Sequence, residues 1–503
     1  MNGVIVIGAG PSGLAVACGL LQQGVPVRVL DRADRPALTS RANILHARGV
    51  EVLDRLGALA DLRDRAVTVM SVTMHVGGRP VTTIRIGAEA GRAEAALVAS
   101  QAEVEARLRD RLTELGGRVE WGTELVDLAQ TRDGVTVTLA DGRTAAAGWV
   151  LGCDGAHSAV RRLAGIGFPG VPSPEQFLLA DAHLDWDVHR EGTAGWYAED
   201  GVLLAMPMRD PDGREDRWRL MANVDLTEPR PPTERALLDR LQELIATRAG
   251  RSDGAIREAV WTSVFRIQRR LAEDYRRGRV LLVGDAAHIH SPMGGQGMNT
   301  GIGDAENLAW KLGLVVAGRA GDGLLDTYAT ERRPLAAEVL RGADAATRLQ
   351  VGAGPVGRFV RDRVMVPVLG LPAVQRWLTG RASQLWVSYR RGPLGGGRRQ
   401  PGRGLRPGDR VPDRRGVLLD AAHSSPSRMY SALRSGWALL DPGDGLCDVA
   451  EKHLGRPVVA LRAGEPRAML VRPDGHLAWS GAPTDVAGLK RWLDSALHRG
   501  RAS

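Results

Sequence analysis

The first 31 residues hold the feature that most constrains how this chain can fold. An apolar run at residues 4–7 leads directly into the glycine-rich segment 8–13, and an apolar, helix-like stretch follows at residues 14–21. A second apolar run then ends at Asp31. Strand, tight turn, helix, strand and acid in this order form the βαβ unit that binds dinucleotides. The sequence therefore predicts an α/β fold with a dinucleotide site near its first glycines.

Each glycine of this turn has a separate physical task. Gly8 permits the sharp turn, Gly10 lets the backbone approach a pyrophosphate, and Gly13 lets the helix pack closely on the strand. The amino terminus of the helix offers unpaired N–H groups to the phosphates. Asp31 stands where a carboxylate accepts hydrogen bonds from an adenosine ribose.

A second glycine-rich segment, residues 352–357, has the same glycine spacing. The residues before it, 341–348, follow a helical pattern, and no strand with a terminal acid comes after it. We interpret this segment as a connection between two helices. The sequence thus predicts one dinucleotide site and not two.

Composition indicates an ordinary globular protein of several domains. The chain has 503 residues, of which 44% are hydrophobic and 25% are charged, and about 150 residues per domain would give three domains. Its net charge of +9 comes from 67 basic and 58 acidic residues, and all but three of the basic residues are arginine. Because acids and arginines alternate, as at 31–35 and 107–111, we expect a mixed, solvated surface and no nucleic-acid partner.

The cysteines and the apolar runs bear on the cellular compartment. Cys18, Cys153 and Cys447 lie far apart, which fits neither a disulfide framework nor zinc spacing and indicates a reducing environment. The amino terminus has no basic stretch before its apolar run. The longest apolar stretch, residues 364–374, is much shorter than the ~20 residues of a spanning helix. We therefore expect a cytoplasmic protein that does not contact a membrane.

The pattern of apolar and polar residues divides the chain into parts. We expect a discontinuous nucleotide-binding domain over residues 1–177 and 271–391, with a helical extension in the second segment. Residues 178–270 change to alternating, strand-like segments, as in an inserted substrate-binding sheet. Residues 392–410 are rich in glycine and proline and predict a linker, and residues 411–503 predict a small α/β domain.

Three further motifs lie in the nucleotide-binding part. Asp154-Gly155 and Gly284-Asp285 each follow an expected strand, and the capping box at 100–103 opens an amphipathic helix. The glycine-rich loop 292–297 leads into another helix, which should begin near Met298. A helix that begins there points the positive end of its dipole at whatever occupies the loop.

With the motifs at 8–13, 153–155 and 284–288 in this order, the chain resembles the single-component (class A) flavoprotein aromatic hydroxylases. This family includes para-hydroxybenzoate hydroxylase and phenol hydroxylase, and the chain looks most like the actinobacterial monooxygenases that modify polyketides and other antibiotics. The resemblance covers essentially the whole chain. It implies a Rossmann-like FAD-binding domain, an inserted β-sheet substrate domain and a C-terminal thioredoxin-like domain.

The resemblance also implies the cofactors and the residues that hold them. FAD is the bound cofactor, and NADPH or NADH visits as a transient co-substrate. Ser12 would contact the pyrophosphate, Asp31 and Arg32 the adenosine, and Arg41 and Gln101 the region of the ribityl chain and pyrophosphate. The complete predicted set is Gly8, Gly10, Pro11, Ser12, Gly13, Asp31, Arg32, Arg41, Gln101, Leu125, Asp154, Gly155, Asp285, Gly297, Met298 and Asn299.

Within this set the later motifs have distinct implied roles. Asp154-Gly155 would hold the domain together and serve both FAD and NAD(P)H, and His157 stands where the family commonly has arginine or lysine. Asp285 would bind the ribityl hydroxyls. Met298 and Asn299 would lie at the pyrimidine edge of the flavin.

The implied reaction is the insertion of one oxygen atom from O2 into a phenolic or polycyclic aromatic substrate through a C4a-hydroperoxyflavin. The flavin carries this chemistry, so we expect no catalytic side chain of the nucleophile–base kind. Baeyer–Villiger oxygenation or epoxidation by the same flavin chemistry is the alternative. A halogenase would need a Trp-x-Trp-x-Ile-Pro segment, which is absent, and a flavin-fold binding protein without turnover is disfavoured by the intact Asp285 loop.

A metal site is not expected. His288 and His290 are the only pair of candidate ligands in the loop, and no cysteine or carboxylate in the neighbouring sequence completes a coordination shell around them.

A group of aromatic and methionine residues in the strand-like region could line a substrate pocket, and ordinary core packing explains the same residues. The C-terminal domain resembles the thioredoxin-fold appendage of phenol hydroxylase but lacks a Cys-x-x-Cys motif, which leaves packing or dimer contact as its role. The protein could be a monomer or a homodimer. The candidate substrate residues are Trp196, Tyr197, Met206, Met208, Trp218, Phe265 and Pro292.

Overall fold

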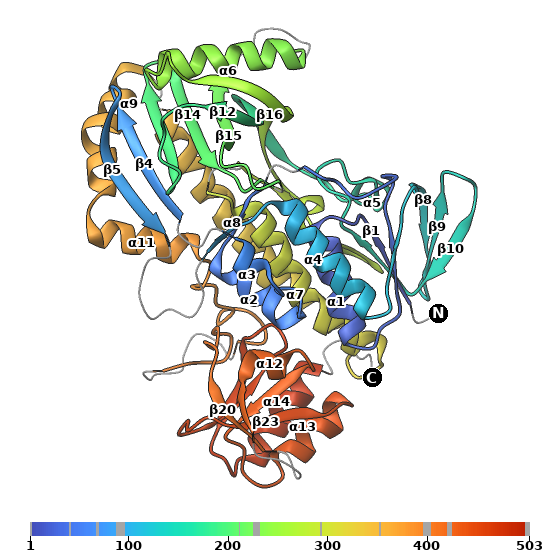
Figure 1. Ribbon diagram of the computed structural model, residues 1–503. Coiled ribbons are helices and arrows are strands. Elements are labelled where there is room, and N and C mark those ends of the chain that lie inside the picture. The colour runs from blue at the N-terminus through green and yellow to red at the C-terminus, as the bar shows by residue number, and fades with distance from the viewer. Residues whose placement is uncertain are drawn as a thin grey trace.

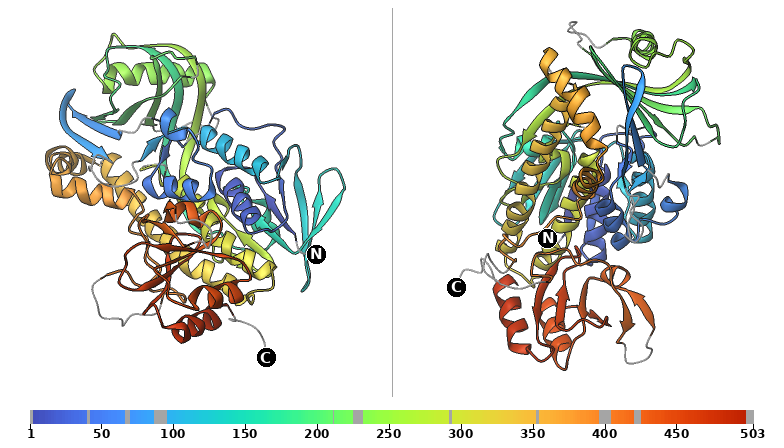
Figure 2. Two further views of the ribbon diagram at one scale, coloured as in Figure 1. Left: turned by 60° about the horizontal axis from the view of Figure 1, so that its bottom comes forward. Right: turned by 90° about the vertical axis from the view of Figure 1, so that its left-hand side faces the viewer.

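The computed structural model describes most of the chain in ten stretches: residues 3–39, 42–66, 70–86, 96–210, 212–224, 232–291, 294–351, 354–395, 404–419 and 425–497. Within them the protein has a mixed α/β fold built on three larger sheets. The six-stranded amino-terminal sheet lies between an eight-stranded sheet at one end of the molecule and the C-terminal domain at the other (Figures 1 and 2).

The six-stranded sheet is the predicted dinucleotide-binding core. Its inner strands pair in parallel, and β18, β11 and β1 are buried along their whole length, which explains their apolar sequences. Helix α1 (Pro11–Gln22) follows the first strand directly. Across the sheet the strands are β17 (Arg276–Arg277), β18 (Val280–Leu282), β11 (Trp149–Gly152), β1 (Val4–Ile7), β2 (Val27–Leu30) and β7 (Val119–Glu120).

Helix α1 packs against α4 (Gln101–Glu114) and α7 (Gln296–Val316) (Figure 1). The α1–α7 contact is close because a Cβ atom at Gly19 would lie 2.7 Å from the Cβ of Ala309. Shorter elements complete this region: α2 (Ala47–Leu56), α3 (Leu62–Arg65), α5 (Ala159–Leu163), and the paired β3 (Ile44–Leu45) and β6 (Leu97–Val98).

A three-stranded sheet flanks the core. In it β9 (Val135–Leu139) forms an antiparallel hairpin with β10 (Thr144–Ala147), and β8 (Leu125–Gln130) pairs with β9 on the other side.

The eight-stranded sheet is larger than the range 178–270 expected from the sequence. Its strand β12 begins at Gly170, before the expected range, and the sheet also includes β4 and β5 from the amino-terminal part of the chain. Helix α6 (Glu234–Arg248) covers one of its faces. In order the strands are β19 (His288–Ile289), β16 (Ala255–Leu271), β12 (Gly170–Asp185), β15 (Arg217–Val224), β14 (Gly201–Pro207), β13 (Thr193–Ala198), β4 (Met70–Val76) and β5 (Arg79–Ile86).

A helical extension returns from the core to this sheet. The glycine-rich segment 352–357 was expected to connect two helices, but its residues 354–357 form the first turn of α9, directly after the end of α8 and the two residues 352 and 353 that are outside the described part. Helices α10 and α11 contact β5. The elements are α8 (Gly323–Val351), α9 (Gly354–Val360), a π-helical turn (Arg361–Met365), α10 (Val366–Leu369) and α11 (Pro372–Ala382).

In its described residues the C-terminal domain has a mixed six-stranded sheet and three helices. Its strands in spatial order are β21 (Pro426–Arg428), β20 (Arg415–Leu418), β23 (Val458–Arg462), β22 (Trp437–Leu440), β24 (Ala468–Val471) and β25 (Leu477–Gly481). The helices are α12 (Met429–Leu433), α13 (Leu446–Leu454) and α14 (Val486–Leu497).

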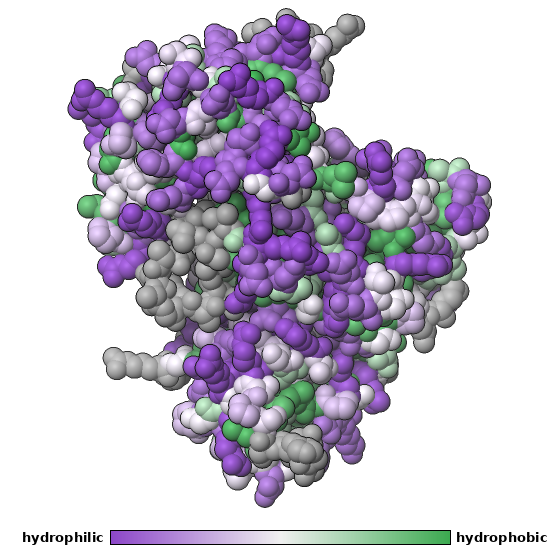
Figure 3. All heavy atoms as spheres, viewed as in Figure 1, coloured by the Kyte–Doolittle hydropathy of each residue, from purple (hydrophilic) through white to green (hydrophobic). Residues whose placement is uncertain are grey.

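The face of the molecule in Figure 3 is mainly hydrophilic, with small scattered apolar groups. Arginines in the charge-rich segment 107–111 pair with acids: Arg107 with Asp61 and Asp110, and Arg111 with Glu114. No helix in the described part of the chain is long and apolar enough to cross a bilayer. All three cysteines are free thiols.

Candidate functional site

The glycine-rich turn has the geometry that a dinucleotide requires. Gly8 has a φ of +104°, and a Cβ there would lie 2.4 Å from the carbonyl oxygen of Cys153. A Cβ at Gly13 would lie 1.9 Å from the carbonyl oxygen of Gly8. At Gly10, by contrast, a Cβ would meet no protein atom within 4 Å. The turn is therefore closed on its inner side and open at Gly10, where a pyrophosphate would approach.

The amino terminus of α1 also fits a phosphate. Gly10 is its N-cap and supplies no side-chain cap, and Pro11 occupies the first turn. The N–H groups that follow are available to an anion, with the helix dipole in the favourable direction.

Ser12 lies where three motifs meet. A Cβ at Gly284 would be 2.4 Å from the hydroxyl oxygen of Ser12, and a Cβ at Gly301 would be 2.3 Å from the same atom. The glycine-rich turn, the Gly284-Asp285 loop and the first turns of α7 therefore converge on one hydroxyl group. The sequence predicted each motif separately, and the structure brings all three together.

Asp31 follows β2 and closes the turn from the other side. Its carboxylate accepts hydrogen bonds from the backbone N–H of Ala9 at 2.7 Å and of Ala33 at 2.8 Å. Each oxygen retains further acceptor capacity for a ribose hydroxyl. Arg32 is exposed beside it.

Two other predicted cofactor residues lie close to this edge. Gln101 is the first residue of α4, whose predicted capping box is present, and its amide donates to Glu105 at 2.8 Å. Burial raises the pKa of Glu105, and the nearby Asp31 contributes in the same direction. Leu125 is buried in the core, and Arg41 lies outside the described residues.

Asp154 acts on the protein itself. Its carboxylate accepts hydrogen bonds from Ser158 Oγ at 2.5 Å and from the N–H groups of Ala159 and Val160 at 2.7 and 3.1 Å, which caps α5. Gly155 has a φ of +75°. This capping shapes the backbone that packs on the glycine-rich turn.

The Gly284-Asp285 motif forms a 3-10 turn (Gly284–Ala286) with the Asp285 side chain exposed. Helix α7 begins at Gln296, two residues before the predicted Met298. Its N-cap, Gly295, has a left-handed backbone with a φ of +62°, which ends the helical conformation on the amino-terminal side, and it supplies no side-chain cap. A Cβ at Gly297 would be 3.7 Å from the His290 ring.

Asn299 is committed to the protein. Its amide nitrogen donates to the carbonyls of Ile44 and Gly295, both at 2.9 Å, and its oxygen accepts from the N–H of His46 at 2.8 Å. The side chain therefore joins β3 to the loop before α7, and Met298 beside it is buried.

His288 and His290 of the loop before α7 have different surroundings. His288 Nε2 bonds to Asp304 Oδ2 at 2.6 Å in a fully buried position. Burial lowers the pKa of His290 to about 4, with a further contribution from the charge on His288, and burial also lowers the pKa of His46. Among the residues that the structure describes, no three His, Cys, Asp or Glu side chains are grouped to hold a metal ion.

The predicted substrate residues fall on both faces of the eight-stranded sheet. Trp196 and Trp218 pack in the core beneath α6, where each contacts the ring of Trp186. Ordinary core packing, the second interpretation that the sequence allowed, fits these two residues. The register places them there because side chains alternate between faces along a strand.

Other candidates lie on the opposite face, toward α10. Tyr197 and Phe265 belong to an apolar cluster there, and Phe265 stacks on Phe177 with ring centroids 5.7 Å apart. Met206 and Met208 both receive a hydrogen bond from the amide of Asn43. Asn43 precedes Ile44, which Asn299 holds, so this face adjoins the start of α7. Pro292 lies outside the described residues.

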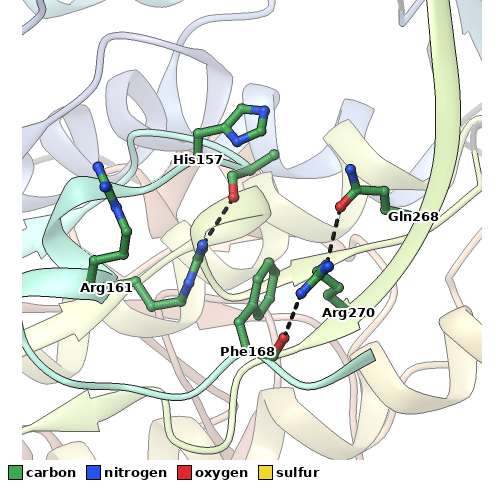
Figure 4. Close-up of a pocket in the computed structure, with 7 residues that line it drawn as sticks. His157, Arg161, Phe168, Gln268 and Arg270 are labelled. Atoms are coloured by element: carbon green, nitrogen blue, oxygen red, sulfur yellow. Dashed lines mark hydrogen bonds between the residues drawn. The ribbon is translucent and has the colours of Figure 1, made fainter. Parts of the chain in front are cut away.

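A basic pocket of about 380 Å³ opens beside the Asp154-Gly155 motif (Figure 4). The Arg161 guanidinium donates to the carbonyls of Ala286 at 2.8 Å and Ala156 at 3.0 Å, and it lies 3.8 Å from the centre of the Phe168 ring. Burial lowers the pKa of Arg161, and the charges of Arg162 and Arg270 add to this effect. The lining residues include no carboxylate: Ala156, His157, Arg161, Arg162, Phe168, Gln268 and Arg270.

The sequence did not predict this pocket. Arg161 and Arg162 follow the Asp-Gly motif directly, so they carried a signal, but Arg270 lies 109 positions beyond Arg161 and is brought in by β16. Arg270 is held by Gln268 at 3.1 Å and by the carbonyl of Phe168 at 3.1 Å.

These features define a dinucleotide-binding α/β protein whose site also adjoins a second sheet. They are the open space at Gly10, the amino terminus of α1 without a side-chain cap, and the meeting of three motifs at Ser12. Comparison with known proteins narrows this class. A family described as the FAD binding domain matches residues 1–343, and one described as aromatic-ring hydroxylase, C-terminal, matches residues 398–499.

Characterised relatives cover almost the entire chain. The 6-methylpretetramide 4-monooxygenase of Streptomyces rimosus is 36% identical, over 98% of this chain and 93% of its own. A rifampicin monooxygenase of Streptomyces venezuelae is 36% identical over 96% of each chain. The solved structure of an anhydrotetracycline hydroxylase from Streptomyces rimosus matches with a TM-score of 0.79 and 33% identity, over 98% and 99% of the two chains.

The chain therefore belongs to the family of FAD-binding aromatic-ring hydroxylases. It is a flavin-dependent monooxygenase with FAD as its cofactor.

Proposed function

We propose that this enzyme inserts one oxygen atom from O2 into an electron-rich ring of a polycyclic, polyketide-type aromatic substrate, with NADPH as reductant. The observation that carries the proposal is that the glycine-rich turn, the Gly284-Asp285 loop and the start of α7 all meet at Ser12. The apolar face of the eight-stranded sheet is connected to this region by the hydrogen bond from Asn43 to Met206. The two relatives above act on 6-methylpretetramide and rifampicin, as their names state.

The residues of the site fit FAD in a simple division of tasks. The open space at Gly10 and the amino terminus of α1 would receive the pyrophosphate, and Asp31 the ribose. Exposed Asp285 would accept hydrogen bonds from the ribityl hydroxyls, and the amino terminus of α7 would stabilise negative charge at the pyrimidine edge. Bound flavin supplies hydride acceptance and oxygen activation.

The substrate ring would lie on the apolar face of the eight-stranded sheet. Phe265, Met206 and Met208 remain candidates there, and Met221 and Met74 belong to the same side. An apolar surface rich in methionine adapts to large planar ligands and keeps water from the reaction.

The basic pocket is our candidate site for the phosphates of NADPH. Three arginines and His157 line it without a carboxylate, and Arg161 joins it to the residue that follows Asp285. We expect Arg162→Met to raise the KM for NADPH by about ten-fold, the loss of one charge-assisted phosphate contact, while the Kd for FAD stays unchanged. Arg132→Met, an exposed arginine in the turn before β9 that does not line the pocket, is the matched control.

We also propose a domain organisation for this activity. The eight-stranded sheet acts as the inserted substrate-binding domain, and the C-terminal domain is a thioredoxin-like module that has lost any dithiol, in a monomer or homodimer. The thiol of Cys447 has a pKa raised by burial, which argues against thiolate chemistry there.

Labelled oxygen tests the proposed reaction. Polycyclic phenols are incubated with the FAD-loaded enzyme, NADPH and ¹⁸O2, and the products are analysed by mass spectrometry. One ¹⁸O atom in a new ring hydroxyl supports the proposal. A labelled lactone or epoxide would instead establish the alternative reactions, and NADPH oxidation that yields only peroxide with every compound would count against this substrate class.

A further inference from the structure

One turn of the C-terminal domain is buried in the FAD-binding part of the molecule. It joins β24 to β25 and has the sequence Arg-Pro-Asp-Gly-His at residues 472–476. Arg472 and His476 are fully buried, and Asp474 is 1% exposed. Because buried charges are costly without partners, the contacts of this turn show what it is built to hold.

The first set of contacts is with helices α7 and α8. Asp474 Oδ2 accepts hydrogen bonds from Asn307 Nδ2 at 3.1 Å and from Trp310 Nε1 at 3.2 Å, both on α7. Arg472 donates to both carboxylate oxygens of Glu331 on α8, at 2.9 and 3.0 Å. The turn thus fixes two helices of the other domain, and α7 is the helix whose first turn lies at the flavin site.

A second set of contacts leads toward the cofactor loop. The His476 ring lies 4.3 Å from that of Tyr389. The Tyr389 hydroxyl accepts a hydrogen bond from Arg332 Nη1 at 2.8 Å, and Arg332 Nε donates to Asp304 Oδ1 at 2.6 Å. All four side chains are buried.

Asp304 passes these contacts to the site. Its other oxygen, Oδ2, accepts from His288 Nε2 at 2.6 Å and from the N–H of Gly284 at 3.3 Å. Gly284 is the residue before Asp285. Arg332 also donates to the carbonyl of Thr300 in the first turns of α7, at 2.9 Å. Both elements expected to face the flavin are therefore held through Arg332.

We propose that Tyr389 and His476 are positioning residues for the flavin. By holding Arg332 they set Asp304, and through it the Gly284-Asp285 loop and the first turns of α7. The C-terminal domain thus contributes to the cofactor site indirectly, through the contacts that run from His476 to Gly284. This inference rests on FAD binding and is independent of the substrate and of the NADPH pocket.

The test compares two buried tyrosines in the full-length protein. Tyr389→Phe removes the hydroxyl that accepts the hydrogen bond of Arg332 Nη1 and leaves the bonds of Arg332 to Asp304 and Thr300 in place. Tyr430→Phe removes a hydroxyl that is equally buried but donates at 3.0 Å to the carbonyl of Val411, inside the C-terminal domain. The measurements are the Kd of the apo-protein for FAD from flavin fluorescence, the visible circular dichroism of bound FAD, its reduction potential, and Tm.

We expect Tyr389→Phe to weaken FAD binding by about five-fold or more, the effect of one lost hydrogen bond, and to change the circular dichroism and the potential. Tyr430→Phe should lower Tm similarly and leave the Kd and both flavin signals at wild-type values. Equal Tm losses with unchanged flavin properties in both variants would overturn the proposal.

A second pair of variants keeps the test decisive if Tyr389→Phe does not fold. His476→Ala removes the ring that contacts Tyr389, whereas His476→Phe keeps an aromatic ring in that place. The proposal requires the flavin circular dichroism to change in His476→Ala and to return toward the wild-type spectrum in His476→Phe. Wild-type spectra and FAD affinity in both would show that the contact is structural only.

Discussion

At the scale of single residues, some of the predicted cofactor residues stabilise the binding loops and others are placed to contact the cofactor. Asp154 and Asn299 were both predicted to serve the cofactor, but their side chains form hydrogen bonds with backbone groups of the protein. Asp285 lies in a tight 3-10 turn with its side chain exposed. A motif in the sequence marks both kinds of residue equally, because both are required for the same loop.

Asp285→Ala should lower the affinity for FAD by about 1.5–3 kcal/mol, the value of a hydrogen bond to a charged group. Titration of the apo-protein with FAD measures this effect. Asp133→Ala, an exposed aspartate in the turn before β9, serves as the control. Wild-type affinity in Asp285→Ala would contradict the assigned role.

His290 makes stability depend on pH. Its pKa is about 4 in the folded protein, below the ordinary 6.5, because burial disfavours the charged ring. As pH falls below 6.5 the unfolded chain takes up a proton that the folded chain does not, so stability is complete above 6.5 and is lost toward pH 4, by at most about 1.4 kcal/mol per unit.

Urea unfolding of the wild type and His290→Asn checks this expectation. The wild type should lose stability more steeply than the variant between about pH 6.5 and pH 5, while His46, present in both, contributes equally. Parallel pH profiles would show that the His290 ring does not behave as a buried neutral group.

At the scale of elements, Gly10 and Gly13 of the same turn differ in the space around them. A methyl group at Gly13 would collide with the carbonyl of Gly8, whereas one at Gly10 would enter open space. The first position is needed by the protein and the second by the ligand.

Gly13→Ala should therefore destabilise the apo-protein by about 3 kcal/mol or more, the upper range for overpacking. Gly10→Ala should leave apo-protein stability within about 0.5 kcal/mol and weaken FAD binding at least ten-fold, or about 1.4 kcal/mol. Tm of the apo-proteins and FAD titration separate the two effects. A destabilised Gly10→Ala apo-protein would show that the turn is closed there.

Elements that depend on local pattern could be predicted from the sequence. The βαβ unit and the capping box at 100–103 both appear as expected. Facts that depend on strand register could not. Trp196 and Trp218 are aromatic and strand-like, but only the pairing decides that they lie beneath α6. The basic pocket needed the same long-range pairing to bring in Arg270.

At the scale of the whole molecule, the C-terminal domain is joined to the rest by buried ion pairs. Arg472 with Glu331 and Arg410 with Glu51 cross this boundary. The pairings lower the pKa of Glu51 and of Glu331 to about 2 against the opposing effect of burial. Loss of one partner of a buried pair costs about 3–5 kcal/mol.

Removal of residues 404–503 should for this reason leave a chain that is mostly insoluble and contains little flavin. The soluble fraction and the FAD-to-protein ratio after expression measure the effect. A soluble, flavin-loaded product would show that the rest of the molecule accommodates the exposed charges.

The parallel pairing of β4 with β13 has a consequence during synthesis. The β4–β5 hairpin ends at Ile86 and β13 begins at Thr193, so the hairpin is synthesised about 107 residues before β13, which is roughly 5–21 s at ordinary elongation rates. Through that interval its inner edge has no partner strand, and an unpaired edge invites association with other nascent chains. Slower translation of residues 87–192 would lengthen the exposure, so the yield of soluble enzyme should respond to codon choice in that segment.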